Sequence, residues 1–208
     1  MISAPARTEW LGPPLRRGAP AAILLPGRDQ PAEFMMELFH QLSLPLSCVV
    51  LTNENNSWYP GRVMEPHAND QSHLNQAIER IESLVTTLER SGISRDRVGI
   101  VGFSQGACVA CEYMFRHPGR WGALIALTGG LFGPAERTGR TESGALESTP
   151  VLLTNSDEDP WVPLTWTRQT AEAFRRCGAI VTERIYAGRA HEISRHEVDA
   201  VRDLLRTL

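Results

Sequence analysis

This sequence lacks long apolar runs, an excess of positive charge and the cysteine spacing of a zinc site. No apolar stretch in its 208 residues approaches the length of a membrane span. The formal net charge of -3 argues against a nucleic-acid partner, because phosphate binding needs a basic surface. Met1 to Pro20 contains no cationic start followed by an apolar region. We therefore expect no secretory signal and a cytoplasmic location.

Cysteine is scarce, and its spacing does not complete a metal site. Cys108 and Cys111 form a C-x-x-C pattern, and Cys48 and Cys177 stand alone. A second C-x-x-C or an H-x-x-x-H, which a zinc site would need, is missing from the sequence. Because the pair falls in a segment predicted to be helical, we interpret both residues as buried apolar thiols. We expect neither a metal nor a cofactor.

The length and composition fit one soluble globular domain over residues 1–208. Apolar residues make up 42% of the chain, which is enough for a sizeable core, and charged residues make up 22%. There is no internal repeat, no low-complexity segment and no insertion long enough for a substantial cap domain.

Short apolar runs alternate with longer amphipathic segments along the chain. The runs predict six strands at Ala21–Leu25, Ser47–Leu51, Val98–Phe103, Ala123–Leu127, Val151–Asn155 and Ile180–Tyr186. The amphipathic segments predict five helices at residues 31–42, Asp70–Arg90, Gln105–Arg116, 163–177 and 192–208. Polar residues 52–67 and 129–149 are predicted to be loops.

Strands that alternate with crossover helices predict a largely parallel sheet covered by helices on both faces. Several of the predicted strands are continuously apolar, as burial on both sides requires. The sequence therefore predicts an α/β fold.

Gly102-Phe103-Ser104-Gln105-Gly106 matches G-x-S-x-G, the pattern of a nucleophile elbow. In such an elbow a serine lies on a tight turn between a strand and a helix, so that its hydroxyl projects above the sheet. The flanking glycines let the strand and helix approach without Cβ clashes. Here an apolar strand enters the turn and a helical segment leaves it, which is the context that the motif requires. Ser104 is therefore the candidate nucleophile.

A serine hydroxyl needs a base that accepts its proton, and in this kind of site the chain order is serine, acid, histidine. Two histidines lie downstream of the acidic candidates. His191 falls between the last predicted strand and the last helix, where a loop can place an imidazole over the edge of the sheet. His196 falls inside the last helix, so we predict that it lies at the surface. We favour His191 as the base.

The orienting carboxylate is expected after the strand Val151–Asn155, where Asp157, Glu158 and Asp159 compete. We favour Asp159 because it precedes a proline, which biases it toward an extended conformation. Asp157 is the alternative, and it would otherwise stabilise the turn. Glu158 is expected to face water.

An oxyanion hole needs two backbone amides that point at the developing negative charge. One is expected from Gln105, the residue after the nucleophile, and the other from an earlier loop between a strand and a helix. Arg28, in Pro26-Gly27-Arg28-Asp29, is our candidate for the second amide. Gly27 is also what an ordinary turn would use, and the sequence does not separate these two interpretations.

These motifs together resemble the phospholipase/carboxylesterase family, which includes small bacterial carboxylesterases and acyl-protein thioesterases. The matching segments run nearly end to end: Leu24-Leu-Pro-Gly27, Ser57-Trp-Tyr-Pro60, Gly102-Phe-Ser-Gln-Gly106, Asp159-Pro-Trp-Val-Pro163 and Gly188-Arg-Ala-His-Glu-Ile193. The resemblance implies an α/β-hydrolase fold without a substantial cap domain. It also implies a triad of Ser104, Asp159 and His191, and an oxyanion hole formed by the amides of Arg28 and Gln105.

The chain departs from the family pattern in three places. Pro26 stands where the family usually has a histidine, and Asn155-Ser156 stands where His-Gly is common. The segment ahead of the first predicted strand is short, so we expect an antiparallel edge strand to be missing or irregular.

The function that we predict is hydrolysis of carboxylic esters through an acyl-enzyme on Ser104, with thioesters and lysophospholipid-type esters as further candidate substrates. The alternatives are a lactonase similar to dienelactone hydrolases, which typically carry a cysteine at the elbow, and a non-catalytic binding protein of the same fold. A small-molecule ester is the expected partner, and an exposed apolar loop or edge strand would support a homodimer.

The aromatic residues of the loops are candidates for the substrate pocket. Trp58, Tyr59 and Trp161 are expected on the carboxyl side of the strands, where such a site opens. Leu131, which follows Gly129-Gly130, would add another wall. The alternative is that these side chains only pack the loops.

Overall fold

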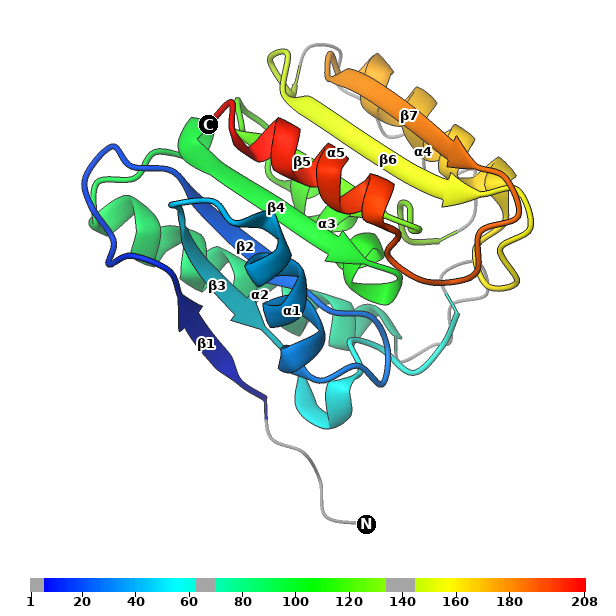
Figure 1. The fold of residues 1–208 in the computed structure, drawn as a ribbon, viewed down its shortest axis with the longest axis horizontal. Helices are drawn as coiled ribbons and strands as arrows, with labels where there is room; N and C mark the ends of the chain where they lie inside the picture. Colours follow the sequence, from blue (N-terminus) through cyan, green and yellow to red (C-terminus); the bar gives the residue numbers. More distant parts are fainter. Residues whose placement is uncertain (1–5, 63–69, 134–144) are drawn as a thin grey trace.

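The computed structural model describes residues 6–62, 70–133 and 145–208, and its centre is one seven-stranded sheet (Figure 1). The strands lie in the order β1-β3-β2-β4-β5-β6-β7, and every neighbouring pair except β1 and β3 is parallel. The strands are β1 (Thr8–Leu11), β2 (Ala21–Leu25), β3 (Ser47–Leu51), β4 (Val98–Phe103), β5 (Ala123–Leu127), β6 (Pro150–Ser156) and β7 (Ile180–Tyr186). The prediction of a largely parallel sheet is confirmed.

Within the described ranges, five α-helices connect or follow these strands, as the periodicity predicts. They are α1 (Ala32–Leu42), α2 (Asp70–Arg90), α3 (Gln105–Arg116), α4 (Leu164–Arg176) and α5 (Arg195–Leu205), and two short 3-10 turns lie at Glu54–Asn56 and Arg95–Arg97. The predicted loops at 52–67 and 129–149 are only partly described, because residues 63–69 and 134–144 lie outside the described part of the chain.

The last helix is shorter than the sequence pattern suggests. It begins at Arg195 rather than at residue 192, because Ser194 accepts a hydrogen bond from the amide of Glu197 while the Glu197 carboxylate accepts one from the amide of Ser194. This reciprocal capping box fixes the start of the helix. Residues 191–193 are thereby left in the loop that follows β7.

The expectation that an antiparallel edge strand is missing or irregular is wrong. β1 pairs antiparallel with β3 in a regular register from Thr8 opposite Leu51 to Leu11 opposite Cys48. The segment does not resemble the other strands because an edge strand is hydrogen-bonded on one side only and needs no continuous apolar run. Its residues accordingly alternate between exposed and partly buried positions.

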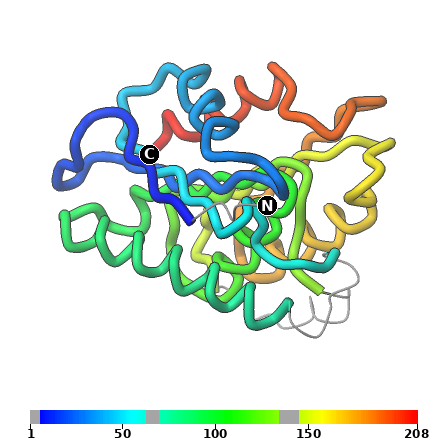
Figure 2. Tube along the Cα trace, turned by 90° about the horizontal axis from the view of Figure 1, so that it is seen from below, coloured from blue at the N-terminus to red at the C-terminus, as the bar shows by residue number. Residues whose placement is uncertain are grey.

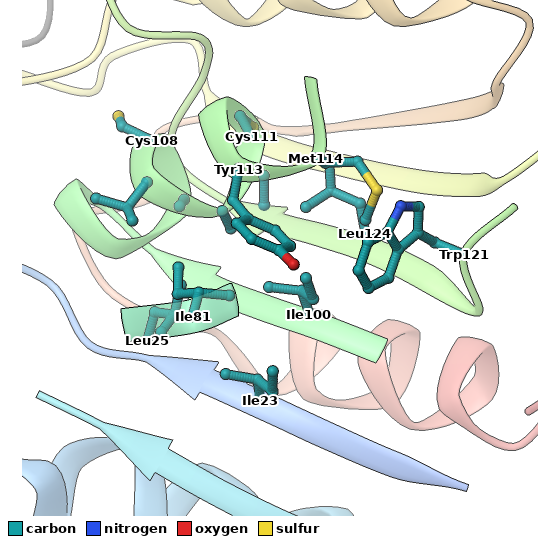
Figure 3. Close-up of a cluster of buried hydrophobic side chains, with 14 of the residues drawn as sticks. Ile23, Leu25, Ile81, Ile100, Cys108, Cys111, Tyr113, Met114, Trp121 and Leu124 are labelled. Carbon is teal, nitrogen blue, oxygen red and sulfur yellow. The ribbon is translucent and has the colours of Figure 1, made fainter. Parts of the chain in front are cut away.

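The helices cover both faces of the sheet, as Figure 1 and the perpendicular view in Figure 2 show. Helices α1 and α5 lie on one face, and α2, α3 and α4 lie on the other. Each face of the sheet has its own cluster of buried apolar side chains. Figure 3 shows part of the larger cluster, where Tyr113 of α3 lies near Ile100 of β4 and Met114 lies near Leu124 of β5. No helix in the described residues is long and apolar enough to cross a membrane.

All four cysteines are buried and unpaired, which confirms the interpretation of the C-x-x-C pattern. Cys108 and Cys111 lie on α3 in the cluster shown in Figure 3. Burial raises the pKa of the Cys111 thiol well above its ordinary value, so this thiol stays neutral and unreactive near neutral pH.

Two glycines allow β4 and α3 to meet at a distance that no other residue permits. A Cβ atom on Gly102 would lie 2.4 Å from the carbonyl oxygen of Gly106, and one on Gly106 would lie 2.3 Å from the carbonyl oxygen of Leu25. The start of α3 is therefore pressed against both β4 and the end of β2.

We predict that Gly106→Ala lowers the free energy of unfolding by about 3 kcal/mol or more, because the added methyl group overlaps rigid backbone. The control is Gly18→Ala, at a glycine with φ +72° and open space around it. That change should cost only about 1–2 kcal/mol of backbone strain. Urea unfolding of both variants tests this, and a Gly106→Ala protein as stable as Gly18→Ala would contradict it.

Candidate active site

Ser104 lies at the junction of β4 and α3 with φ 52° and ψ -118°, a conformation that costs roughly 1–3 kcal/mol for a residue other than glycine. Its amide donates to the carbonyl of Leu127 at the end of β5, and its own carbonyl accepts from Cys108 in the first turn of α3. These bonds and the close glycine contacts hold the strained turn in place. The predicted elbow is therefore present in the backbone.

The side chains of Ser104, His191 and Asp159 form one hydrogen-bonded chain. His191 Nε2 lies 2.8 Å from Ser104 Oγ, and His191 Nδ1 lies 2.7 Å from Asp159 Oδ2. The Asp159 side chain is fully buried and that of His191 is 19% exposed. The structure thus brings together three side chains that lie 32 and 87 residues apart in sequence.

This geometry defines the tautomer of a neutral His191. Because the Asp159 carboxylate can only accept, Nδ1 must carry the proton that it donates, and the lone pair of Nε2 then faces the Ser104 hydroxyl. The ring is also packed against Phe103, with ring centroids 5.1 Å apart. Nε2 is therefore placed to accept a proton from Ser104.

Asp159 and Asp157 have different surroundings, although both belong to the loop after β6. Asp159 Oδ1 accepts from the amides of Trp161 and Val162, at 2.9 and 2.8 Å, so that both carboxylate oxygens are occupied. Asp157 Oδ1 instead accepts from the amide of Gly188, at 2.8 Å, and links this loop to the loop that carries His191. The local turn suggested for Asp157 is thus replaced by a bridge between two loops.

Asn155, near the end of β6, holds the loop that carries Asp159. Its buried side chain donates to the carbonyl of Val162 at 3.0 Å and to Thr167 Oγ1 at 2.8 Å, and accepts from the amide of Ser156. Asn155 is one of the two residues at which the chain departs from the common His-Gly pattern. In this structure it connects the end of β6 to Val162, at the far end of the loop, and to Thr167 in the first turn of α4.

A cavity of about 320 Å³ opens beside Ser104 and His191. Of the predicted substrate-binding residues, Tyr59 and Trp161 line it, and Trp161 is 58% exposed. Trp58 and Leu131 do not belong to its lining, contrary to expectation. The remaining lining residues are Arg28, Asp29, Gly61, Arg62, Gln105, Cys108 and Val162.

Trp58 and Leu131 are buried outside the cavity lining, and their polar groups are hydrogen-bonded to other parts of the chain. The Trp58 indole N–H donates to the carbonyl of Pro26 at 2.8 Å. The amide of Leu131 donates to Thr170 Oγ1, and its carbonyl accepts from the indole of Trp166. These two residues pack the loops, which was the alternative interpretation.

The segment 58–61, which forms one wall of the cavity, is held by the side chains of Gln105 and Arg28. Gln105 Oε1 accepts from the amide of Trp58 at 2.8 Å, and its Nε2 donates to the carbonyl of Tyr59 at 2.6 Å. The Arg28 guanidinium donates to the carbonyls of Tyr59, Pro60 and Gly61. Sequence reasoning used only the amides of Gln105 and Arg28 and missed these side chains.

The backbone amides of the same two residues have no hydrogen-bond acceptor among the residues that the structure describes. Within the described residues, no backbone carbonyl accepts from the Arg28 amide. The amide of Gln105, in the first turn of α3, has no partner within the helix. Both residues line the cavity with Ser104.

Two titratable groups of the cavity lining stay uncharged. Burial raises the pKa of both Tyr59 and Cys108, so that each stays protonated near neutral pH. Within the described part of the chain, no group of three or more His, Cys, Asp or Glu side chains is arranged to hold a metal ion.

This fold and the geometry of its site place the protein in the class of α/β-hydrolases. The phospholipase/carboxylesterase family model matches residues 45–208, and the chain belongs to that family. A solved structure of a phospholipase/carboxylesterase from Dyadobacter fermentans is similar over 99% of both chains, with 29% identity and a TM-score of 0.86. The acyl-protein thioesterase 2 structure from Zea mays, at 19% identity and a TM-score of 0.75 over 96% of this chain and 97% of that one, shares the fold.

Curated relatives match over a shorter length. Acyl-protein thioesterase 1 of Gibberella zeae is 28% identical over 56% of this chain and 50% of its own length. Esterase YpfH of Escherichia coli is 28% identical over 61% of this chain and 51% of its own length. The matches therefore span about half the length of these relatives.

We predict that Gln105→Leu lowers the free energy of unfolding by about 1–3 kcal/mol, because it leaves the buried amide of Trp58 without its partner and removes one of the two donors to the carbonyl of Tyr59. The matched control is Gln41→Leu at an exposed position of α1, which should stay within about 0.5 kcal/mol of the wild type. Equal stability of the two variants in urea unfolding would show that the side chain of Gln105 does not hold the segment 58–61.

Proposed function

We propose that this protein is a serine hydrolase that cleaves carboxylic esters through an acyl-enzyme on Ser104. The observation that carries the proposal is the continuous hydrogen-bonded chain from Ser104 through His191 to the buried Asp159. Such a chain activates a hydroxyl that is otherwise a poor nucleophile at neutral pH.

The first step transfers the acyl group to the enzyme. Ser104 Oγ attacks the ester carbonyl while its proton passes to His191 Nε2, and the resulting imidazolium is stabilised by Asp159. His191 then gives this proton to the leaving alcohol as the carbon–oxygen bond breaks. In the second step water, deprotonated by His191, attacks the acyl-enzyme and releases the acid together with free Ser104.

The amides of Arg28 and Gln105 are the proposed oxyanion hole. Both line the cavity beside Ser104, and neither is used by the hydrogen bonding described above. Because their side chains are fixed to the segment 58–61, the two amides are held in place before the substrate arrives. Donors that need no reorganisation stabilise the tetrahedral oxyanion most effectively.

The lining of the cavity suits a substrate whose acyl or alcohol group is largely apolar. Tyr59, Val162 and Trp161 supply apolar surface, and Arg62, which lies over the Trp161 ring with its Cζ atom 5.6 Å from the centroid, adds a cation at the lining. Thioesters undergo the same attack on their carbonyl carbon, so they belong to the proposed substrate range. The names of the relatives, an esterase and an acyl-protein thioesterase, agree with this chemistry.

We predict that Ser104→Ala lowers the turnover of p-nitrophenyl acetate by about four to six orders of magnitude, because the nucleophile is removed. The variant should unfold close to the wild-type temperature, because alanine adopts the same backbone conformation and the change removes only the hydrogen bond between the hydroxyl and His191. Hydrolysis at the wild-type rate in a folded Ser104→Ala protein would exclude Ser104 as the nucleophile.

Asp159→Asn is predicted to lower kcat by about 10⁴, because an amide that donates to Nδ1 favours the wrong tautomer of His191. Asp157→Asn is the matched control two residues away. Its amide oxygen can still accept from Gly188, so kcat should stay near the wild-type value. If the two variants lost activity in the reverse order, Asp157 rather than Asp159 would be the orienting acid.

A further inference from the structure

Arg189 and Glu197 form an ion pair in the interior of the protein, next to the three side chains of the site. Arg189 Nε lies 3.5 Å from Glu197 Oε2, and the two side chains are 5% and 0% exposed. A buried ion pair loses most of its Coulombic gain to desolvation, so it adds little net stability. Its contacts indicate a different role.

The first of these contacts are to the backbone on both sides of His191. The amide of Glu192 donates to the carbonyl of Ala190 at 2.8 Å, which closes a tight turn with His191 at its centre. Arg189 Nη1 donates to the carbonyls of both Ala190 and Glu192. One planar guanidinium group therefore holds the carbonyls of the two residues on either side of His191.

The other end of the guanidinium is anchored beside the elbow. Arg189 Nη2 donates to Thr128 Oγ1 at 2.6 Å. Thr128 is fully buried with φ 53°, and it directly follows Leu127, whose carbonyl accepts from the Ser104 amide at 2.9 Å. Through Arg189, the His191 turn is thus bound to the end of β5, which also holds Ser104.

Glu197 supplies the charge that compensates the guanidinium, and Arg189 Nε, which makes no hydrogen bond within the described residues, lies 3.5 Å from its carboxylate. The Glu197 carboxylate accepts from Thr154 Oγ1 at 2.6 Å and from the amide and hydroxyl of Ser194, at 2.8 and 2.9 Å. Thr154 lies on β6, the strand that leads to Asp159. The ion pair therefore contacts a segment next to each of the three residues of the site.

We infer that Arg189 is the positioning residue of this site, with a guanidinium whose charge is compensated by Glu197 and that keeps His191 within hydrogen-bond distance of Ser104 and Asp159. The inference rests on the proposed hydrolase function. A guanidinium presents donors in a fixed planar fork, whereas a lysine ammonium is a flexible point charge that does not hold two carbonyls and a hydroxyl in one plane. A displacement of about 1 Å at a reacting group can cost about 100-fold in rate.

Two variants test the inference while avoiding an unpaired buried charge. Arg189→Lys keeps a cation beside Glu197 but loses the fork. The double variant Arg189→Met, Glu197→Gln removes both charges and keeps a residue that can complete the capping box with Ser194. Arg195→Met, an exposed arginine at the start of α5, is the matched control.

We expect kcat for p-nitrophenyl acetate to fall at least 10-fold in Arg189→Lys and about 100-fold in the double variant, with KM within about threefold of the wild type. The downfield proton NMR signal of the His191 Nδ1–H, identified by its loss in Asp159→Asn, should shift or broaden in both variants. A residue that serves stability alone would leave this signal and kcat unchanged. The Arg195→Met control should match the wild type in both measurements.

The possible failures are distinguishable. A wild-type protein that does not hydrolyse the ester would overturn the proposed function itself. An active wild type whose folded Arg189→Lys and double variants keep full kcat and an unchanged downfield signal would overturn only the role of Arg189. A rise in KM at constant kcat would also overturn it, because it would place Arg189 in substrate binding.

Discussion

The strained turn at Ser104 is the constraint on which the rest of the site depends. A residue with a side chain is held at positive φ between a strand and a helix because Gly102 and Gly106 let the backbone of β4, α3 and β2 come within contact distance. The same turn directs the Ser104 hydroxyl toward His191 and leaves the amide of Gln105 at the start of a helix. The candidate nucleophile and the candidate oxyanion donor are thus consequences of one backbone conformation.

The loops around this turn are held by buried polar side chains rather than by regular structure. Gln105 and Arg28 hold the segment 58–61, Asn155 holds the loop of Asp159, and Arg189 holds the turn of His191. Each of these side chains bonds to backbone groups of the segment that it holds. Because a buried unpaired polar group is costly, such contacts give a loop one preferred conformation.

Most of the strands and helices could be predicted because burial on both faces of a parallel sheet leaves continuous apolar runs, such as AAILL at Ala21–Leu25. Strand β1 was missed because an edge position imposes no such pattern. The start of α5 was placed too early, although Ser194 and Glu197 have the spacing of a capping box and would have located it.

The site was predictable to the extent that chain order and local motifs determine it, so Ser104, Asp159 and His191 could be nominated and the structure brings them together. Contacts between distant loops leave no local pattern. The link from Asp157 to Gly188 and the ion pair of Arg189 with Glu197 depend on how the ends of β6 and β7 are aligned in the sheet. Trp58 was misplaced for a similar reason, since its indole is committed to a carbonyl 32 residues away.

The central claim is that Ser104 is an activated nucleophile, and covalent labelling with a fluorophosphonate tests it most directly. The account predicts that one molecule of probe adds to each native chain and that peptide mass spectrometry places the adduct on Ser104. It also predicts that prior denaturation abolishes the reaction, because the unfolded chain has no His191 beside the serine. A native protein that stays unlabelled, or one labelled at another residue, would contradict the account.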